Sequence, residues 1–142
     1  MLRNMSLVAL GGLFLTTHAT AQGSTRRIGS IQSYSAGPVI TAPDTVRVAT
    51  PFVVTVNTFG SSSCTAPDGA AVEITGLVAT ITPYDRFPSE ATICTGDIAP
   101  RPHRVQMKFG VAGAATIRVR GYTFSNGQRV LSSVDHLTVV QP

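Results

Sequence analysis

From Pro38 onward, apolar and polar residues alternate along most of the chain, and valine, isoleucine and threonine dominate the alternating runs. Proline, glycine, serine and aspartate interrupt these runs at short intervals. This pattern is typical of short antiparallel strands joined by turns, and helical spacing is not sustained over two consecutive turns. The sequence therefore predicts an all-β chain of about seven short antiparallel strands, folded as a β-sandwich or a barrel.

Two runs indicate which side chains point inward, because alternate residues of a strand share one face. The expected inward positions are Phe52, Val54 and Val56 in residues 52–59, and Val105, Met107 and Phe109 in residues 104–109. Further strands are expected over residues 39–40, 45–48, 71–74 and 77–82, with a bend at Thr75-Gly76. Residues 83–102 are predicted to be the least regular part.

The strongest local prediction is a C-terminal hairpin with Asn126-Gly127 at its tip, because both residue types accept positive φ. The flanking strands are expected over residues 116–124 and 128–140. This tip sets a register in which Val119 faces Val134 on the core side, and Arg118 faces Asp135 on the exposed side.

Continued without a break, the same register would place Leu137 and Val139 on the outer face, beside the arginines of the partner strand. Large apolar side chains are more often buried than exposed. A β-bulge near Asp135-His136 would return both residues to the core. We therefore expect a bulge there.

The stretch from Phe109 to Gly121, FGVAGAATIRVRG, resembles the corner and penultimate strand of bacterial Ig-like and fibronectin-type-III-like domains. In such domains a glycine at the corner leads into a small residue and then alternating isoleucine and valine. Residues 45–56 look like their first strands. The resemblance implies an Ig-like sandwich and a role as an adhesive or spacer module. The chain has no tryptophan, so the antibody-type disulfide core is not implied.

The N-terminus has the layout of a secretory signal. Arg3 precedes an apolar run over residues 7–15, and small residues follow up to Ala21. We expect a signal peptide over residues 1–21, a flexible Gly/Ser-rich lead-in over residues 22–37 and one domain over residues 38–142. The apolar run is too short to span a membrane, which takes about 20 residues. Cleavage predicts export to the periplasm or the extracellular space, without a membrane span in the mature chain.

Two cysteines in an exported chain favour a disulfide between Cys64 and Cys94. Both fall in expected loops, so the bond would tie two loops at one end of the sandwich. In a loop-closure picture it removes unfolded-state entropy on the order of 3 to 4 kcal/mol. The formal net charge of +4 loses one with Arg3, and this mild charge is unlike the basic stripe of a nucleic-acid binder.

Catalytic and metal chemistry find little support in the residue pattern. His103 and His136 remain after cleavage, and neither lies near a G-x-S-x-G turn. A copper site would draw on His103, Met107 and His136, but Met107 has the spacing of a core residue. A calcium site would draw on Asp85, Glu90 and Asp97, which lack the spacing of an oxygen-ligand loop. We expect no enzyme, no cofactor and no bound metal.

Aromatic, proline and arginine residues gather in residues 83–104, and these types are enriched where proteins bind partners. The candidate binding loop comprises Tyr84, Arg86, Phe87, Arg101, His103 and Arg104. The leading hypothesis is a non-catalytic binding or structural module of the bacterial cell envelope or secretome, with an unidentified protein or envelope polymer as partner. The alternatives are a protease inhibitor or accessory subunit that presents a disulfide-held loop and, more remotely, a small metal carrier.

Overall fold

The computed structural model describes residues 23–34, 36–89 and 93–142, so the expected signal peptide lies outside the described residues. The described residues form strands and no helix, which confirms the all-β prediction. They also contain no helix long and apolar enough to cross a membrane. The strands are β1 (Ser24–Ile28), β2 (Ile40–Thr41), β3 (Thr45–Arg47), β4 (Phe52–Gly60), β5 (Ala66–Thr75), β6 (Val78–Pro88), β7 (Ala99–Met107), β8 (Gly113–Ser125) and β9 (Gln128–Gln141).

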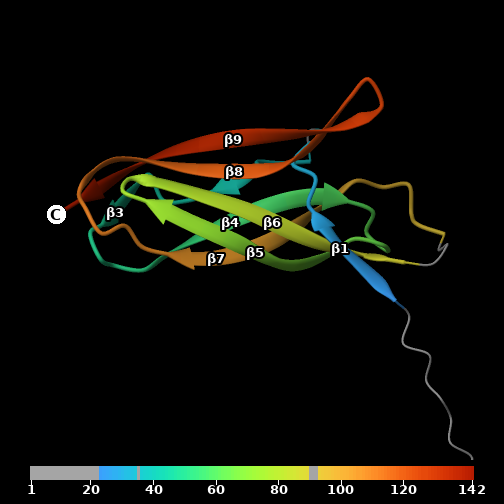
Figure 1. The fold of residues 1–142 in the computed structure, drawn as a ribbon, viewed down its shortest axis with the longest axis horizontal. Coiled ribbons are helices and arrows are strands. Elements are labelled where there is room, and N and C mark those ends of the chain that lie inside the picture. Colours follow the sequence, from blue (N-terminus) through green and yellow to red (C-terminus); the bar gives the residue numbers. More distant parts are fainter. Residues whose placement is uncertain (1–22, 35, 90–92) are drawn as a thin grey trace, which may run out of the picture.

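The strands form two sheets (Figure 1). The larger sheet has six strands. Five of them follow the order β1-β6-β8-β9-β3, and the sixth, β5, also pairs with β6. The smaller sheet has the order β2-β4-β7. Short connections carry the chain from one sheet to the other, and β5 lies close to β7 at one side. The two sheets therefore curl around one shared interior.

The pairing is mixed, which differs from the purely antiparallel arrangement of about seven strands that the sequence suggested. The pairs β6·β8 and β3·β9 are parallel, and nine strands are present in the described residues. The physical reason is a crossover: after β6 the chain forms β7 in the smaller sheet and returns at β8 in the direction of β6. A connection of that kind joins parallel neighbours.

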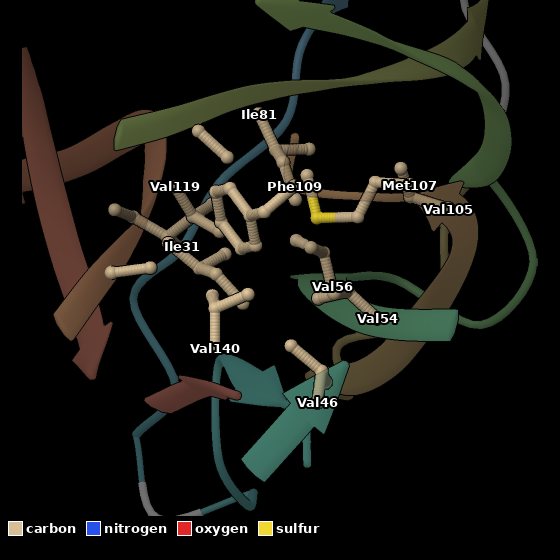
Figure 2. Close-up of a cluster of buried hydrophobic side chains, with 13 residues drawn as sticks. Ile31, Val46, Val54, Val56, Ile81, Val105, Met107, Phe109, Val119 and Val140 are labelled. Carbon is tan, nitrogen blue, oxygen red and sulfur yellow. The ribbon is translucent and has the colours of Figure 1, made fainter. Parts of the chain in front are cut away.

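The core consists of aliphatic side chains from both sheets around the ring of Phe109 (Figure 2). Phe109 has no exposed surface, and the ring of Phe52 stacks on it at a centroid distance of 5.9 Å. The inward faces predicted for residues 52–59 and 104–109 are confirmed. The buried set comprises Ile31, Val46, Val54, Val56, Ala79, Ile81, Val105, Met107, Phe109, Ala115, Ile117, Val119 and Val140.

The C-terminal hairpin has the predicted tip and register. Asn126 and Gly127 have φ values of 51° and 76°, and the pairs Arg118–Asp135 and Val119–Val134 are both present. The expectation that the second pair lies in the core is wrong for Val134, which is 38% exposed, whereas Val119 has no exposed surface. Positive φ at both tip residues is what a two-residue turn between twisted strands requires. The turn thus fixes the register of the whole hairpin.

The predicted bulge near Asp135-His136 is wrong. The register continues unbroken to Val140, which leaves Leu137 73% exposed and Val139 51% exposed on the outer face. Thr138 and Val140 already occupy the inward positions of this segment, and each is 2% exposed. A slip by one residue would expose that inward set, because strand side chains alternate. The unbroken register is therefore kept, although it leaves the side chains of Leu137 and Val139 exposed.

The structure also corrects the flexible lead-in expected over residues 22–37. β1 pairs with β6 over its full length, and Ile31 belongs to the core at 3% exposure. Gly29 in this segment has a packing role. A Cβ on Gly29 would lie 2.3 Å from Thr58 Cγ2 and 2.7 Å from Asp85 Oδ2, so the small residue permits close approach of the two sheets. The folded domain thus begins well before Pro38.

Candidate functional site

The structure places the six residues of the predicted binding loop on strands. Tyr84, Arg86 and Phe87 lie on β6, while Arg101, His103 and Arg104 lie on β7. The expectation of an irregular segment over residues 83–102 is therefore wrong at both ends. β-Branched and aromatic residues favour strands, and the prolines at 83, 88, 100 and 102 are accommodated within or at the ends of β6 and β7.

These six side chains do not form one site. Tyr84 carries the guanidinium of Arg26 over its ring at 3.7 Å, and Arg86 forms an ion pair with Asp68 at 2.6 Å. Phe87 lines a pocket described below, while His103 is buried. Alternate residues of β6 and β7 point to opposite faces, so residues close in sequence are separated in space. Arg101 is half-buried and Arg104 is exposed on the outer face of β7.

The predicted disulfide between Cys64 and Cys94 is confirmed, with a Cα–Cα distance of 5.5 Å. It joins the loop after β4 to the loop before β7, as the sequence suggested. We call this part of the molecule, with residues 61–65 and 93–98, the disulfide end. In Figure 1 it lies opposite the C-terminus, near the tip of the β8–β9 hairpin. Two loops that are distant in sequence are thus held together there.

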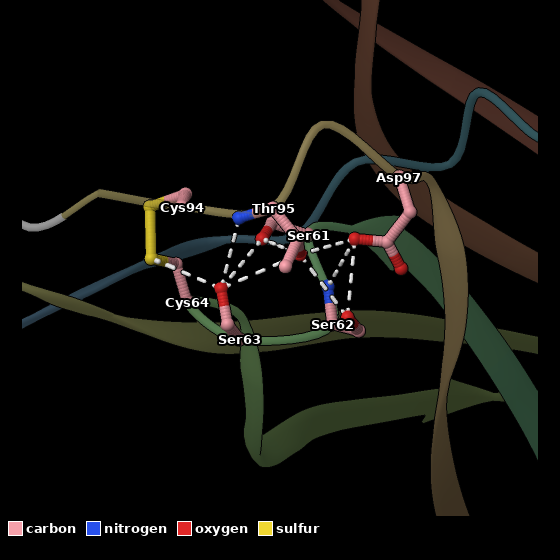
Figure 3. Close-up of a disulfide and its surroundings, with 7 residues drawn as sticks. All are labelled: Ser61, Ser62, Ser63, Cys64, Cys94, Thr95 and Asp97. Carbon is pink, nitrogen blue, oxygen red and sulfur yellow. Dashed lines mark hydrogen bonds between the residues drawn. A yellow bond between two sulfur atoms is a disulfide. The ribbon is translucent and has the colours of Figure 1, made fainter.

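A network of hydroxyl groups reinforces the disulfide end (Figure 3). The Thr95 backbone N–H donates to Ser63 Oγ at 3.0 Å, and the Thr95 and Ser61 hydroxyls lie 2.8 Å apart. The Ser62 backbone N–H and hydroxyl both donate to Asp97 Oδ1 at 3.1 Å. Each of these contacts joins the loop of Cys64 to the loop of Cys94. The covalent bond is therefore one of several ties between the two loops.

The carboxylate of Asp97 is the acceptor at the centre of this network. Hydrogen bonds from the Thr95 hydroxyl and then from the Ser62 backbone N–H lower the pKa of Asp97 from 3.8 to about 2. Donors of this kind favour the charged form of a carboxyl group. Asp97 thus remains ionised and keeps its hydrogen bonds well into the acid range.

A second polar cluster lies in the interior, between the two sheets. The hydroxyl of Thr58 on β4 donates to Asp85 Oδ1 at 2.9 Å, and His103 Nε2 on β7 lies 3.0 Å from the same oxygen. His103 Nδ1 lies 3.1 Å from the carbonyl oxygen of Gly69. Asp85 belongs to the larger sheet, while Thr58 and His103 belong to the smaller one. The cluster therefore links both sheets.

The three side chains of this cluster superficially suggest a nucleophile, a base and an acid. Thr58 and Asp85 have no exposed surface, and His103 is 4% exposed. A catalytic nucleophile needs access to substrate and a base that takes its proton. Here the Thr58 hydroxyl donates to the carboxylate, and the surrounding side chains cover all three groups. The arrangement is that of a structural link.

A pocket of about 350 Å³ opens at the disulfide end, where five segments distant in sequence meet. Its wall combines the disulfide with the buried side chains of Phe59 and Thr65. Three exposed apolar side chains form part of its rim: Tyr34 at 57%, Ile98 at 46% and Phe124 at 47%. The volume and the largely apolar lining are typical of small-molecule sites. The remaining lining residues are Arg27, Ser30, Gln32, Gly60, Ser61, Phe87 and Arg129.

A second hollow of about 400 Å³ lies on the outer face of the larger sheet, between the side chains of β5, β6, β8 and β9. Its lining is mainly polar. One of its two arginines, Arg118, is already held by Asp135 through two hydrogen bonds of 2.9 Å and 2.8 Å. Glu73 supplies an acidic group on the same face. The hollow lacks the buried apolar wall of the pocket at the disulfide end.

The described residues do not bring together the ligands considered for a copper site or for a calcium site. Met107 is a core residue at 5% exposure, as its spacing predicted, and His103 is engaged with Asp85. Among the described residues, no group of three or more histidine, cysteine, aspartate or glutamate side chains could hold a metal ion. Glu90, one of the calcium candidates, lies outside the described residues. Asp85 and Asp97 lie in the two separate networks described above.

Comparison of the chain with protein-family models, with curated proteins and with solved structures found no match. Several pocket residues also escaped the sequence analysis. Arg27 lies in the segment expected to be flexible, and Phe59 lies in a strand with no sign of a pocket. Phe124 and Arg129 flank the Asn126-Gly127 tip, and an aromatic and a cation beside a hairpin tip are the one signal that sequence offered.

Proposed function

We propose that this protein is an exported, non-catalytic binding module of the bacterial cell envelope or secretome that works through its disulfide end. The disulfide itself supports an oxidising compartment, because such bonds persist mainly outside the cytosol. The finer fold class, an Ig-like sandwich, is part of the proposal, and two facing sheets with a shared core support it.

The observation that carries the proposal is the pocket rim. Tyr34, Ile98 and Phe124 come from three separate segments, and all three expose large apolar side chains around one opening. Clustered exposed apolar surface at a concave site marks binding surfaces more often than scattered apolar residues do. The disulfide and its hydroxyl network hold the loops in place before binding, which lowers the ordering cost.

The test is an amide-shift titration of the isotope-labelled protein with a panel of small apolar fragments. We expect shifts that cluster at Tyr34, Ile98 and Phe124 and that weaken in a Phe124→Ser variant. Val111→Ser is the matched control, because Val111 is 51% exposed but does not line the pocket. Shifts spread evenly over the surface, or concentrated on the outer face of the larger sheet, would contradict the proposal.

One observation favours the inhibitor alternative. Ile93, next to Cys94, is 98% exposed, and an apolar side chain on a disulfide-held loop is a form that a protease subsite accepts. Inhibition of a serine protease that Ile93→Asp abolishes would support this function. Rapid cleavage of the chain beside Ile93, with no inhibition, would exclude it.

A further inference from the structure

Building on the proposed function, we infer that the pocket at the disulfide end binds a small molecule with an apolar body and one carboxylate-like anionic group. The apolar walls of the pocket favour the apolar body of the ligand, and its two arginines favour the anionic group. None of the described residues that line it is acidic. A ligand that enters with a negative charge would therefore meet two cations and no acidic side chain among the described lining residues.

Arg27 is the first of these cations. It lies on β1, and its guanidinium carbon is 5.5 Å from the centre of the Phe87 ring, which also lines the pocket. The side chain is exposed and has no ion-pair partner among the described residues. Its neighbour Arg26 differs, because it pairs with Asp68 at 3.3 Å. Arg27 is thus available to a ligand where Arg26 is not.

Arg129 is the second cation, and its guanidinium is held in position by the protein. Its guanidinium carbon lies 4.2 Å from the centre of the Tyr122 ring, and Nη2 donates to the carbonyl oxygen of Ile28 at 3.1 Å. Neither contact neutralises the charge. A guanidinium has five N–H donors in a fixed plane, so donors remain for a carboxylate, which it binds in a bidentate manner.

The rest of the pocket suits an apolar body. The Phe59 side chain, 4% exposed, and the Cys64 side chain, 7% exposed, form part of the buried wall, while Phe124 and Tyr34 offer ring faces at the rim. Apolar surface around an ion pair excludes water and strengthens the attraction between the charges. A ligand can therefore keep its apolar body against these side chains while its charged end lies beside the exposed Arg27 and Arg129.

The lack of an ion-pair partner does not by itself distinguish Arg27 and Arg129. Arg104 and Arg120 also lack such a partner among the described residues. The difference lies in the surroundings. Arg104 is exposed on the outer face of β7, and Arg120 shares the polar hollow of the larger sheet with Glu73. Of the arginines in the described part of the chain, only Arg27 and Arg129 line the apolar pocket at the disulfide end.

The test uses three probes that share one phenyl-propyl body: hydrocinnamate, its neutral amide hydrocinnamide, and phenylpropylamine. Amide shifts at Tyr34, Ile98 and Phe124 of the full folded domain report binding in the pocket. We expect hydrocinnamate to bind with a dissociation constant on the order of 1 mM, a value usual for a ligand of this size. Hydrocinnamide should bind about tenfold more weakly than hydrocinnamate, and phenylpropylamine more weakly still.

The variants Arg27→Gln and Arg129→Gln keep hydrogen-bond donors and remove the charge, and the double variant should bind the acid and the amide equally. Arg104→Gln is the matched control and should retain the preference for the acid. Thermal unfolding of each variant checks that the fold persists. An unchanged preference in the double variant would overturn the inference.

The outcomes separate the ligand class from the proposed function. If all three probes shift the pocket amides with equal affinity, the binding site stands and the anionic class is wrong. If the amine binds best, the charge argument is wrong in sign. If none of the probes shifts the pocket amides while the apolar fragments do, the ligand class fails alone, and if nothing binds there the proposed function fails as well.

Discussion

His103 Nε2 lies 3.0 Å from Asp85 Oδ1, and this buried pair bridges the two sheets of the domain. The exposed fractions of the two side chains are 2% and 0%. Both ring nitrogens of His103 face oxygen acceptors, since Nδ1 lies 3.1 Å from the Gly69 carbonyl oxygen. The ring therefore contacts an oxygen atom at each of its two nitrogens. The second oxygen of Asp85, Oδ2, has no hydrogen-bond partner among the described residues.

Removal of one partner of this pair should destabilise the fold strongly. His103→Leu leaves the buried Asp85 Oδ1 with the Thr58 hydroxyl as its remaining partner, and a buried polar group that loses a hydrogen-bond partner costs about 1–3 kcal/mol in the free energy of unfolding. Urea denaturation measures the change. Asp135→Asn breaks the exposed ion pair with Arg118 and is the matched control, for which we expect a much smaller loss. Equal losses in the two variants would show that the buried pair has no special role.

Gly29→Ala tests the close approach of the two sheets beside the same carboxylate. The added Cβ would meet Thr58 Cγ2 and Asp85 Oδ2 inside their contact distances. Overpacking of this kind costs about 1–3 kcal/mol, measured by denaturant or thermal unfolding. Gly110→Ala is the control, since nothing lies within 4 Å of a Cβ at that position. A stability equal to that of the Gly110 variant would mean that Gly29 is not tightly packed.

The disulfide end should loosen in acid through Asp97. Its pKa is lowered from 3.8 to about 2 in the folded protein, chiefly by the Thr95 hydroxyl and the Ser62 backbone N–H. A lowered carboxyl pKa stabilises the folded form above pH 4, and this contribution is lost as the pH falls from about 4 to about 2. The Ser62 amide signal should therefore titrate with a midpoint near 2.

Asp97→Asn should remove that titration while the rest of the spectrum stays unchanged. The amide group keeps an acceptor oxygen for Ser62 but does not ionise. A Ser62 midpoint near 4 in the native protein would mean that the hydrogen bonds to Asp97 do not favour its charged form.

The disulfide should contribute much of the domain's stability. The Cys64→Ser/Cys94→Ser double variant opens a loop with a sequence separation of 30, for which loop-closure entropy gives about 3–4 kcal/mol. Urea denaturation measures this loss, and hydrogen exchange should show faster opening of residues 61–65 and 93–98. The native protein should also be lighter than the reduced protein by two protons in intact-mass measurement. A loss below about 1 kcal/mol would mean that the hydroxyl network suffices to hold both loops.

Leu137→Thr tests the outer-face position of Leu137 on β9. The side chain is 73% exposed, so the substitution should change the free energy of unfolding by less than about 0.5 kcal/mol. Val140→Thr is the contrast, because Val140 is 2% exposed and belongs to the core. A large loss at Leu137 would support the bulge that the sequence suggested and would contradict the unbroken register.

Local patterns predicted the elements whose partners lie close in sequence. The Asn126-Gly127 turn fixes the β8–β9 register because its backbone preference acts at the tip, and alternation alone identifies the inward faces at Val105, Met107 and Phe109. The pairing of Cys64 with Cys94 followed from their number. These features need no knowledge of distant strands.

The features that sequence reasoning missed depend on strands far apart along the chain. β1 consists largely of polar residues, and its strand conformation follows from the exposed edge of β6 that it covers. The burial of His103 depends on Asp85 and Thr58, which meet it only when the two sheets face each other. The pocket likewise needs β1, two loops and a hairpin tip at one end, and no short motif encodes such a meeting.

The parallel pair of β3 with β9 has a consequence for the time order of folding. Thr45 pairs with Val139, and β1 pairs with Tyr84 and its neighbours. Strands near the N-terminus therefore pair with segments that are synthesised later. A chain that emerges from its N-terminus can form the β5–β6 and β8–β9 hairpins locally, but it cannot complete the larger sheet until residues 139–141 have emerged. The larger sheet therefore lacks its β3·β9 pair until residues 139–141 are available.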